Sequence, residues 1–384
     1  MATDIRKINN GASSTRSVYQ HRHFCIRTFH LLLTHPAYSC LLLFVIYLQI
    51  MDMILYCKIR SRGPLHSNAK TNNDTSLKLF ASLPVKKIMV GQITQYVRSP
   101  LAEYVESDLY FTSYFPSISP NAISMFHCFL SIISIKFFSS DSLLQRRIGV
   151  LIFEFRNFLD CLDGVVFRAR IKNLRYKSYR GNSGYYIDGI TDVLGGTCLI
   201  VGCLLHFFKQ RPLRSITHKT NQTLSTRMSR SSDNESEEAD LIILNLDDEQ
   251  KQQSTNGINS NTFETKTRII IALSLFSVQY ALAGMFWNRE VQAYEDLLDS
   301  YINQSRRQGL QMTILHSPLT ILMFYLWRYL SAINVQDYLI FAILFDRTWE
   351  FIQKINKIGC LCLLITVFVT ELHIDQIRSI LHLF

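Results

Sequence analysis

The sequence lacks the features that mark several common protein classes. Its nine cysteines are odd in number and most lie in or beside hydrophobic segments, which favours reduced, apolar side chains over a disulfide framework. The Cys–Cys–His spacing of a zinc site is absent, and no Ser–His or Cys–His arrangement of a covalent catalyst is evident. There is also no internal repeat. Any chemistry must therefore come from other residue types.

Hydrophobic residues make up 48% of the chain, but they are unevenly distributed. Apolar runs of about 20 residues, the length that crosses a bilayer, alternate with polar stretches. A soluble protein would spread its apolar residues at a period of about 2 or 3.6 residues. The sequence therefore predicts an all-α, polytopic transmembrane helical bundle. The net charge is +10, and the basic residues lie beside apolar runs. This position favours anionic headgroups or a diphosphate over nucleic acid as partners.

Composition divides the chain into parts. They are a basic N-terminal tail (1–36), an N-terminal transmembrane helix (37–57), a polar and interfacial segment (58–118), a catalytic transmembrane core (119–208), a disordered loop (209–266) and the remaining transmembrane helices with the C-terminal tail (267–384). The first helix is too long for a signal-peptide core and has no clear cleavage site after it. The loop is polar and poor in aromatics, so it cannot bury enough apolar surface to become ordered.

We expect about seven membrane spans, over 37–57, 119–138, 148–166, 184–208, 268–287, 318–330 and 355–370, with a shorter apolar piece at 338–345. The segment 92–115 mixes aromatic and charged residues, and it suits either a helix in the membrane interface or an ordinary loop.

Four aspartates lie at the facing ends of the third and fourth predicted spans. An ionised carboxylate inside a membrane costs on the order of several kcal/mol, so its presence points to a function. Asp160 and Asp163 close the third span, and Asp188 and Asp192 open the fourth. Spacings of three and four residues place each pair on one helix face. A short connection makes the two helices antiparallel neighbours, so the two acidic faces can converge.

Carboxylates at such close quarters repel one another unless cations neutralise them. An all-oxygen site suits a hard divalent ion, Mg²⁺ or Mn²⁺. We expect two ions, because a pair can clamp a diphosphate. Gly164 and Gly184 leave room for a ligand or a neighbouring backbone, whereas Gly195 and Gly196 favour close helix packing. Arg168 lies about one turn beyond Gly164, where its fork can hold phosphate oxygens.

The connection 169–183 carries basic residues and no acidic one; they are Arg170, Lys172, Arg175, Lys177 and Arg180. This charge is open to two interpretations. It is either a positive-inside topology signal or an attraction for an anionic nucleotide.

The aspartate pattern resembles a known signature. Asp160-Cys161-Leu162-Asp163-Gly164, followed by Gly184-xxx-Asp188-xxx-Asp192, is similar to the motif of the CDP-alcohol phosphatidyltransferases. That motif reads D-x2-D-G-x2-A-R, a spacer of about eight or nine residues, then G-x3-D-x3-D. The helix entry 119–124 (SPNAIS) also resembles the family, and the likeness covers about Phe111 to Phe208.

Two features depart from the family pattern. Phe167 stands at the alanine position, and fifteen residues separate Arg168 from Gly184. The dipeptide Ala169-Arg170 supplies the missing pair two positions late, but Arg168 keeps the family's distance from Gly164 and is the favoured candidate. The longer spacer and the sequence around it resemble one branch of the family, the ceramide phosphoethanolamine synthases of invertebrates.

The resemblance implies roles for particular residues. Asp160, Asp163, Asp188 and Asp192 would bind metal, and Asp192 would also be the general base. Four residues would line the CDP site; they are Asp160, Gly164, Arg168 and Gly184. Arg170 and Asn121 are further candidates for that site.

The branch that the chain resembles transfers phosphoethanolamine from CDP-ethanolamine to the primary hydroxyl of ceramide and releases CMP. It implies a multi-pass Golgi membrane enzyme with a lumenal site, surrounded by membrane lipids. The alternative is an ethanolamine- or cholinephosphotransferase of the endoplasmic reticulum membrane that uses diacylglycerol. A prenyltransferase and an ion transporter are weaker alternatives, which release of CMP would exclude. We also expect a homodimer as the assembly and no nucleic acid as partner.

Other polar residues within spans have structural interpretations. We expect His127 and His206 to be hydrogen-bonded residues of the bundle, and Glu154 to pair with Lys136 between the third and second spans. Asp346 and Glu350 would mark a membrane boundary.

Overall fold

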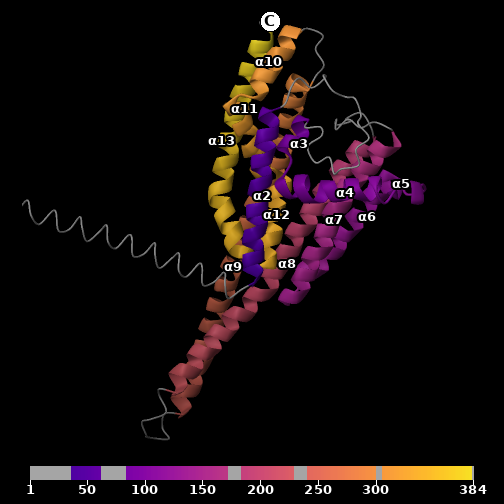
Figure 1. Cartoon of the computed structure of the whole chain (residues 1–384). Coiled ribbons are helices and arrows are strands. Elements are labelled where there is room, and N and C mark those ends of the chain that lie inside the picture. Colours follow the sequence, from indigo (N-terminus) through magenta and orange to yellow (C-terminus); the bar gives the residue numbers. More distant parts are fainter. Residues whose placement is uncertain (1–35, 62–83, 172–182, 229–239, 300–304, 383–384) are drawn as a thin grey trace, which may run out of the picture. The chain divides into compact units, whose positions relative to one another are not determined.

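The protein is described here by a computed structural model, which covers residues 36–61, 84–171, 183–228, 240–299 and 305–382. All regular elements in these ranges are helices, so the predicted all-α fold is confirmed (Figure 1). The elements are α2 (Pro36–Arg60), α3 (Val85–Met89), η1 (Thr94–Arg98), α4 (Ser99–Ser107), α5 (Phe111–Tyr114), α6 (Pro120–Phe138), α7 (Leu143–Arg170), α8 (Ser183–Met228), α9 (Asp240–Leu298), α10 (Ser305–Leu315), α11 (Pro318–Leu330), α12 (Ala332–Leu344) and α13 (Thr348–His382).

The chain forms two compact units, Met1–Ser61 and Arg62–Phe384. In the first unit, α2 has 25 residues and exposes large apolar side chains such as Leu43 and Met53. A helix with such a surface is stable in hydrocarbon because all its backbone groups are bonded internally.

Among the described residues, five helices are long and apolar enough to cross a membrane; they are Ser39–Arg60, Pro120–Phe138, Tyr186–Lys209, Lys266–Leu298 and Thr348–Leu381. A sixth candidate is the pair Gln308–Leu315 and Pro318–Leu330, which bends by 59°. The chain is therefore a multi-pass membrane protein. The predicted apolar piece at 338–345 corresponds to the short helix α12.

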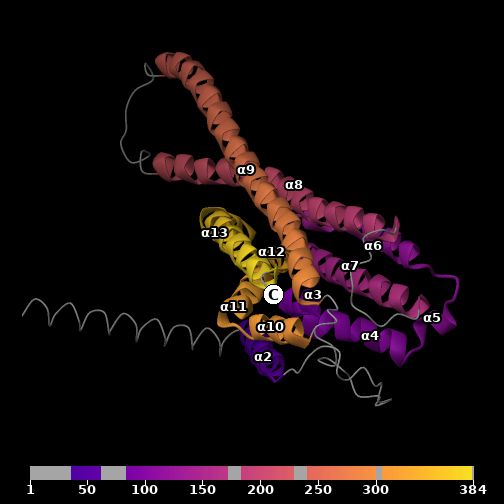
Figure 2. The ribbon, with the colours of Figure 1, turned by 90° about the horizontal axis from the view of Figure 1, so that it is seen from above.

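The third predicted span is not among these candidates, because α7 carries too many charges. Its 28 residues nevertheless pack along α6, and the turn 139–142 makes the two helices antiparallel. Figures 1 and 2 both show α7 beside α4 and α6. Several of its charged groups are buried, among them Arg156 and Asp163. A helix of this length that follows a spanning helix is long enough to cross the bilayer itself.

The expectation of a disordered loop over 209–266 was too broad. α8 continues to Met228 and α9 begins at Asp240, so only 229–239 of that loop lies outside the described residues. Figure 1 shows both helices continuing past the neighbouring ends of α6 and α7. Hydropathy marks where a helix leaves the membrane and not where it ends. Each further residue of an existing helix adds a hydrogen bond without a new nucleation cost.

Two hydrophobic clusters hold the second unit together. One joins α6, α7, α8, α9, α12 and α13, and includes Phe153, Phe276 and Leu339. The other fastens α4 and α6 to the C-terminal part of α7, through Ala102, Ile123 and residues such as Leu162 and Val166. Helix covers most of 94–114, which excludes the ordinary-loop interpretation of that segment. This second cluster packs against the turns of α7 that carry the aspartates.

Candidate active site

The two pairs of aspartates come together against α6. α7 ends at Arg170, and it carries Asp160 and Asp163 on successive turns near this C-terminal end. α8 begins at Ser183, which places Asp188 in its second turn. Because α6 packs along both α7 and α8, the acidic faces of these two helices meet beside it. The predicted convergence of the two motifs is therefore what the structure shows.

The residues that meet are not the four aspartates alone. Oxygens of Asp160, Asp163 and Asp188 and a ring nitrogen of His127 all lie within 4.8 Å of one another. Such spacing allows all four atoms to reach one ion at the usual distances of about 2.0–2.2 Å. A cluster from three helices thus forms a candidate metal site.

His127 differs from the sequence-based prediction. It lies on α6 and is fully buried, and neither ring nitrogen has a hydrogen-bond partner among the residues that the structure describes. Nε2 is 3.7 Å from Asp160 Oδ1 and 3.6 Å from Asp163 Oδ2, beyond hydrogen-bond range. Asp160 Oδ1 is also buried without a partner in this part of the chain. Unpaired buried groups cost about 1–3 kcal/mol each, and a cation between them would satisfy both.

One signal for His127 was present in the sequence. Ser124 is the last residue of the motif that opens α6, and His127 follows it by three residues. The two residues therefore share a helix face. In the structure, Ser124 Oγ donates a 2.6 Å hydrogen bond to Asp163 Oδ2. Ser119 caps the same helix by accepting from the Ala122 backbone N–H. The motif therefore orients α6 toward the aspartates.

Asp192 has a different neighbour. Its Oδ1 accepts a 2.7 Å hydrogen bond from Nη2 of Arg156, which is 3% exposed. Arg156 lies four residues before Asp160, one turn deeper in α7. Arg156 was not among the predicted site residues, although its spacing from Asp160 is visible in the sequence. Asp192 is thus paired with a guanidinium, and its side chain also contacts that of Asp160 in the His127 cluster.

The small residues of α8 make room for these side chains. A Cβ at Gly195 would lie 2.7 Å from Arg156 Nη2, and one at Gly196 would lie 2.5 Å from the Tyr280 ring. Both glycines therefore permit close packing, which agrees with the sequence-based interpretation.

The residues predicted to line the nucleotide site lie at the same end of these helices. A Cβ at Gly164 would be 3.4 Å from Arg168 Nη1, and one at Gly184 would be 3.4 Å from Asn121 Oδ1. Arg168 is half-buried, whereas the exposed Arg170 donates to the backbone carbonyls of Pro116 (2.7 Å) and Ile118 (2.6 Å). The basic residues from Lys172 to Arg180 lie outside the described residues.

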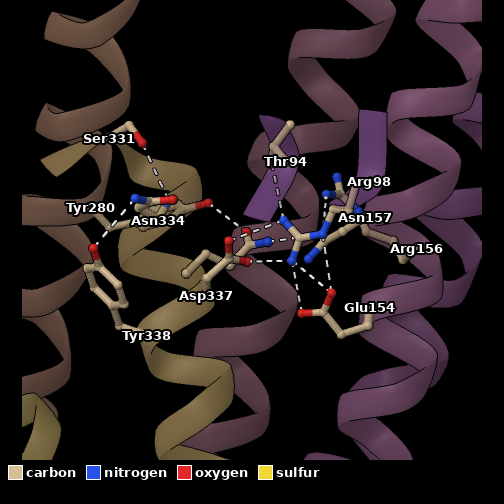
Figure 3. A network of polar contacts seen from close by, with 11 residues as sticks. Thr94, Arg98, Glu154, Arg156, Asn157, Tyr280, Ser331, Asn334, Asp337 and Tyr338 are labelled. Carbon is tan, nitrogen blue, oxygen red and sulfur yellow. Dashed lines mark hydrogen bonds and ion pairs between the residues drawn. The ribbon is translucent and has the colours of Figure 1, made fainter. Parts of the chain in front are cut away.

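A second buried polar cluster surrounds Arg98, where η1, α7 and α12 meet (Figure 3). Arg98 Nη2 donates to Asp337 Oδ1 at 2.6 Å and to Glu154 Oε2 at 2.8 Å, and joins η1 to α7 and α12. Burial lowers the pKa of Arg98 and the two carboxylates raise it; the balance is upward, so the guanidinium stays charged. We call Arg98, Glu154 and Asp337 the Arg98 cluster. The prediction that Glu154 pairs with Lys136 was wrong, because Glu154 turns toward η1 instead of α6.

His206 also has partners, as predicted. Its ring contacts the Arg146 guanidinium, and its Nδ1 lies 3.0 Å from the Ser140 carbonyl. Arg146 also donates to Asp346 Oδ1 at 2.8 Å. This group of residues lies at the N-terminal end of α7, away from the aspartates.

Comparison with known proteins identifies the family. The sequence model of the family described as ceramide phosphoethanolamine synthase matches residues 33–237 and 233–383. The chain belongs to the ceramide phosphoethanolamine synthase family. A Drosophila melanogaster protein named ceramide phosphoethanolamine synthase is 29% identical over 296 residues, which are 77% of this chain and 68% of that protein. No solved structure matches the chain.

Membership of the ceramide phosphoethanolamine synthase family makes the chain a membrane transferase. The matched region includes every residue of the site described above.

Proposed function

We propose that the protein transfers phosphoethanolamine from CDP-ethanolamine to the primary hydroxyl of ceramide and releases CMP. The name of the Drosophila relative supports the donor group and the lipid acceptor. The observation that carries the proposal is the meeting of His127, Asp160, Asp163 and Asp188 beside Asp192. A membrane transferase that handles a nucleotide diphosphate needs such a cluster, because the diphosphate charge has to be neutralised away from water.

The four donors fit a divalent cation, Mn²⁺ or Mg²⁺. Three carboxylates suit both hard ions, and the partnerless His127 nitrogens and Asp160 Oδ1 supply the reason to expect an ion at this place. When bound, such an ion neutralises charge on the phosphates of the donor and of the departing CMP.

The chain's own residues perform the remaining tasks. Asp192 accepts the proton of the lipid hydroxyl, whose oxygen forms a bond to the β-phosphorus of the donor. The bond from that phosphorus to the bridging oxygen breaks, and CMP leaves with the electron pair. Gly164 and Gly184 leave space for the nucleotide, and Arg168 beside Gly164 holds phosphate oxygens.

The decisive experiment is an assay of the purified protein. CDP-ethanolamine and CDP-choline are each offered with ceramide and with diacylglycerol, and CMP and the lipid product are measured. Ceramide phosphoethanolamine should be the main product, activity should vanish with excess chelator, and Mn²⁺ or Mg²⁺ should restore it. A preference for diacylglycerol would favour the alternative, an ethanolamine- or cholinephosphotransferase. Full turnover in chelator would contradict the metal-dependent mechanism.

We further propose a Golgi membrane location with a lumenal site. The closeness of Asn121 to Gly184 supports a common side for the starts of α6 and α8, where the aspartates lie. The acceptor sequence at Asn73 would share that side, and those at Asn221 and Asn234 would face the other. A glycan on Asn73 and none on Asn221 or Asn234 is therefore expected, and a glycan on Asn221 or Asn234 would put the aspartates in the cytosol. Asn73 and Asn234 lie outside the described residues. The homodimer stays a prediction.

A further inference from the structure

Arg156 is held firmly from several sides. Its Nη2 donates to Asp192 Oδ1 at 2.7 Å and to the Thr191 carbonyl at 3.2 Å, while Nη1 donates to Asn157 Oδ1 at 3.1 Å. The side chain is 3% exposed, so this guanidinium cannot exchange these partners for water without moving.

Residues of neighbouring helices support the Arg156 side chain. Gln336 Nε2 of α12 donates to Asn157 Oδ1 at 3.0 Å, and Tyr280 Oη of α9 donates to Gln336 Oε1 at 2.9 Å. Gly195 of α8 leaves the volume that the guanidinium fills, since any Cβ there would lie 2.7 Å from Nη2. Arg156, Asn157 and Tyr280 are labelled in Figure 3. These contacts fix the position and the orientation of the Arg156 guanidinium.

We propose that Arg156 is the resident cation of the aspartate site and takes the place of a second metal ion. Its ion pair neutralises the charge of Asp192, so the protein takes one divalent ion, at His127, Asp160, Asp163 and Asp188. This inference rests on the metal site of the proposed function. It departs from the pair of ions that the aspartate motif predicts.

Charge favours this arrangement. One divalent ion and one guanidinium leave a single formal negative charge among the four carboxylates. A second divalent ion on Asp192 would lie within a few ångströms of the buried guanidinium, and two cations at such distances repel by about 4 kcal/mol or more per unit charge pair. His127 adds a neutral ligand to the first ion without adding charge.

The same contact would position Asp192 for its task. Arg156 bonds Oδ1, and the Asp192 side chain is 41% exposed, so the carboxylate stays accessible to the lipid hydroxyl. Arg156 therefore acts as a positioning residue, through Asp192, and does not itself touch the reacting atoms.

Counting bound manganese tests the proposal. The purified full-length chain is titrated with Mn²⁺ by calorimetry, and electron paramagnetic resonance reports whether two ions couple magnetically. We expect one Mn²⁺ per wild-type chain and no coupled pair. Arg156→Gln should admit a second, coupled Mn²⁺, whereas Arg156→Lys and the exposed control Arg147→Gln should keep one. Arg156→Lys should also lower kcat more than it changes the KM for CDP-ethanolamine, because its ammonium points differently at Asp192.

A coupled manganese pair in the wild-type chain, with or without CDP, would overturn the proposal, as would a single ion in folded Arg156→Gln. If Arg156→Gln fails to fold, the wild-type count still decides. Release of CMP is measured separately, so two ions with normal CMP release would reject this inference and leave the proposed function intact. One bound ion without CMP release from any donor would reject the proposed function and leave this inference intact.

Discussion

The Arg98 cluster and the aspartate site differ in how completely their buried polar groups are hydrogen-bonded. In the Arg98 cluster, one guanidinium reaches two carboxylates, and every charged group has hydrogen-bond partners. In the aspartate site, formed by His127, Arg156, Asp160, Asp163, Asp188 and Asp192, the imidazole nitrogens and Asp160 Oδ1 have none among the described residues. The first cluster is complete as folded. The second leaves buried polar atoms that a metal ion would satisfy.

This difference separates a structural role from a functional one. A satisfied buried ion pair adds rigidity, and its removal leaves a charge in an apolar interior. Carboxylates that outnumber the nearby cations repel one another and destabilise the folded chain until a metal ion binds. Variants of the two clusters should therefore affect different measurements.

The largest effect should come from the aspartate ligands. Asp160→Ala, Asp163→Ala and Asp188→Ala should each lower turnover by at least about 10³-fold, or about 4 kcal/mol of activation free energy, because each removes a donor to the ion. Initial-rate assays measure this, with thermal unfolding in detergent as the check on folding. The exposed Asp375→Ala should retain full activity. A ligand variant with near-normal turnover would remove that residue from the site.

Breaking the Arg98 cluster should instead cost stability. Arg98→Met leaves Asp337 and Glu154 without their cation, and the expected loss is about 3–5 kcal/mol of unfolding free energy. The melting temperature should fall clearly, while turnover per folded molecule stays near the wild-type value. Arg347→Met removes an exposed pair with Glu350 and should change stability by about 1 kcal/mol or less. Equal melting temperatures for the two variants would contradict the comparison.

His127→Ala tests the unpredicted member of the aspartate site. Loss of this ligand should weaken Mn²⁺ binding about 10–100-fold, or about 1.4–2.7 kcal/mol, as read by calorimetric titration. His373→Gln is the matched control, because His373 is buried but hydrogen-bonded to Tyr294. Unchanged manganese affinity in folded His127→Ala would assign His127 to packing only.

The smallest effect should distinguish the two arginines at the end of α7. Arg168→Ala should raise the KM for CDP-ethanolamine about tenfold, since the side chain lies beside Gly164. Arg170→Ala should change it less, because Arg170 already bonds the carbonyls of Pro116 and Ile118. The reverse ranking in steady-state kinetics would move the nucleotide site toward Arg170.

Sequence alone determined the helical class, the multi-pass membrane character and the positions of the aspartate motifs. These depend on local properties, because apolar runs and the spacings of Asp160, Asp163 and Asp188 are fixed by helix geometry. It also placed His206 and Gly195 correctly. The sequence did not predict how far α8 and α9 continue beyond their apolar parts.

Only the tertiary structure decided which side chains meet. Pairing between helices depends on their rotation and relative depth, and hydropathy reports neither. α6 is rotated so that His127 faces Asp160 and Asp163, which makes it a ligand candidate instead of a packed histidine. α7 is rotated so that Arg156 faces α8 while Glu154 faces η1. Side chains two residues apart on one helix point in different directions, and that geometry separates the aspartate site from the Arg98 cluster.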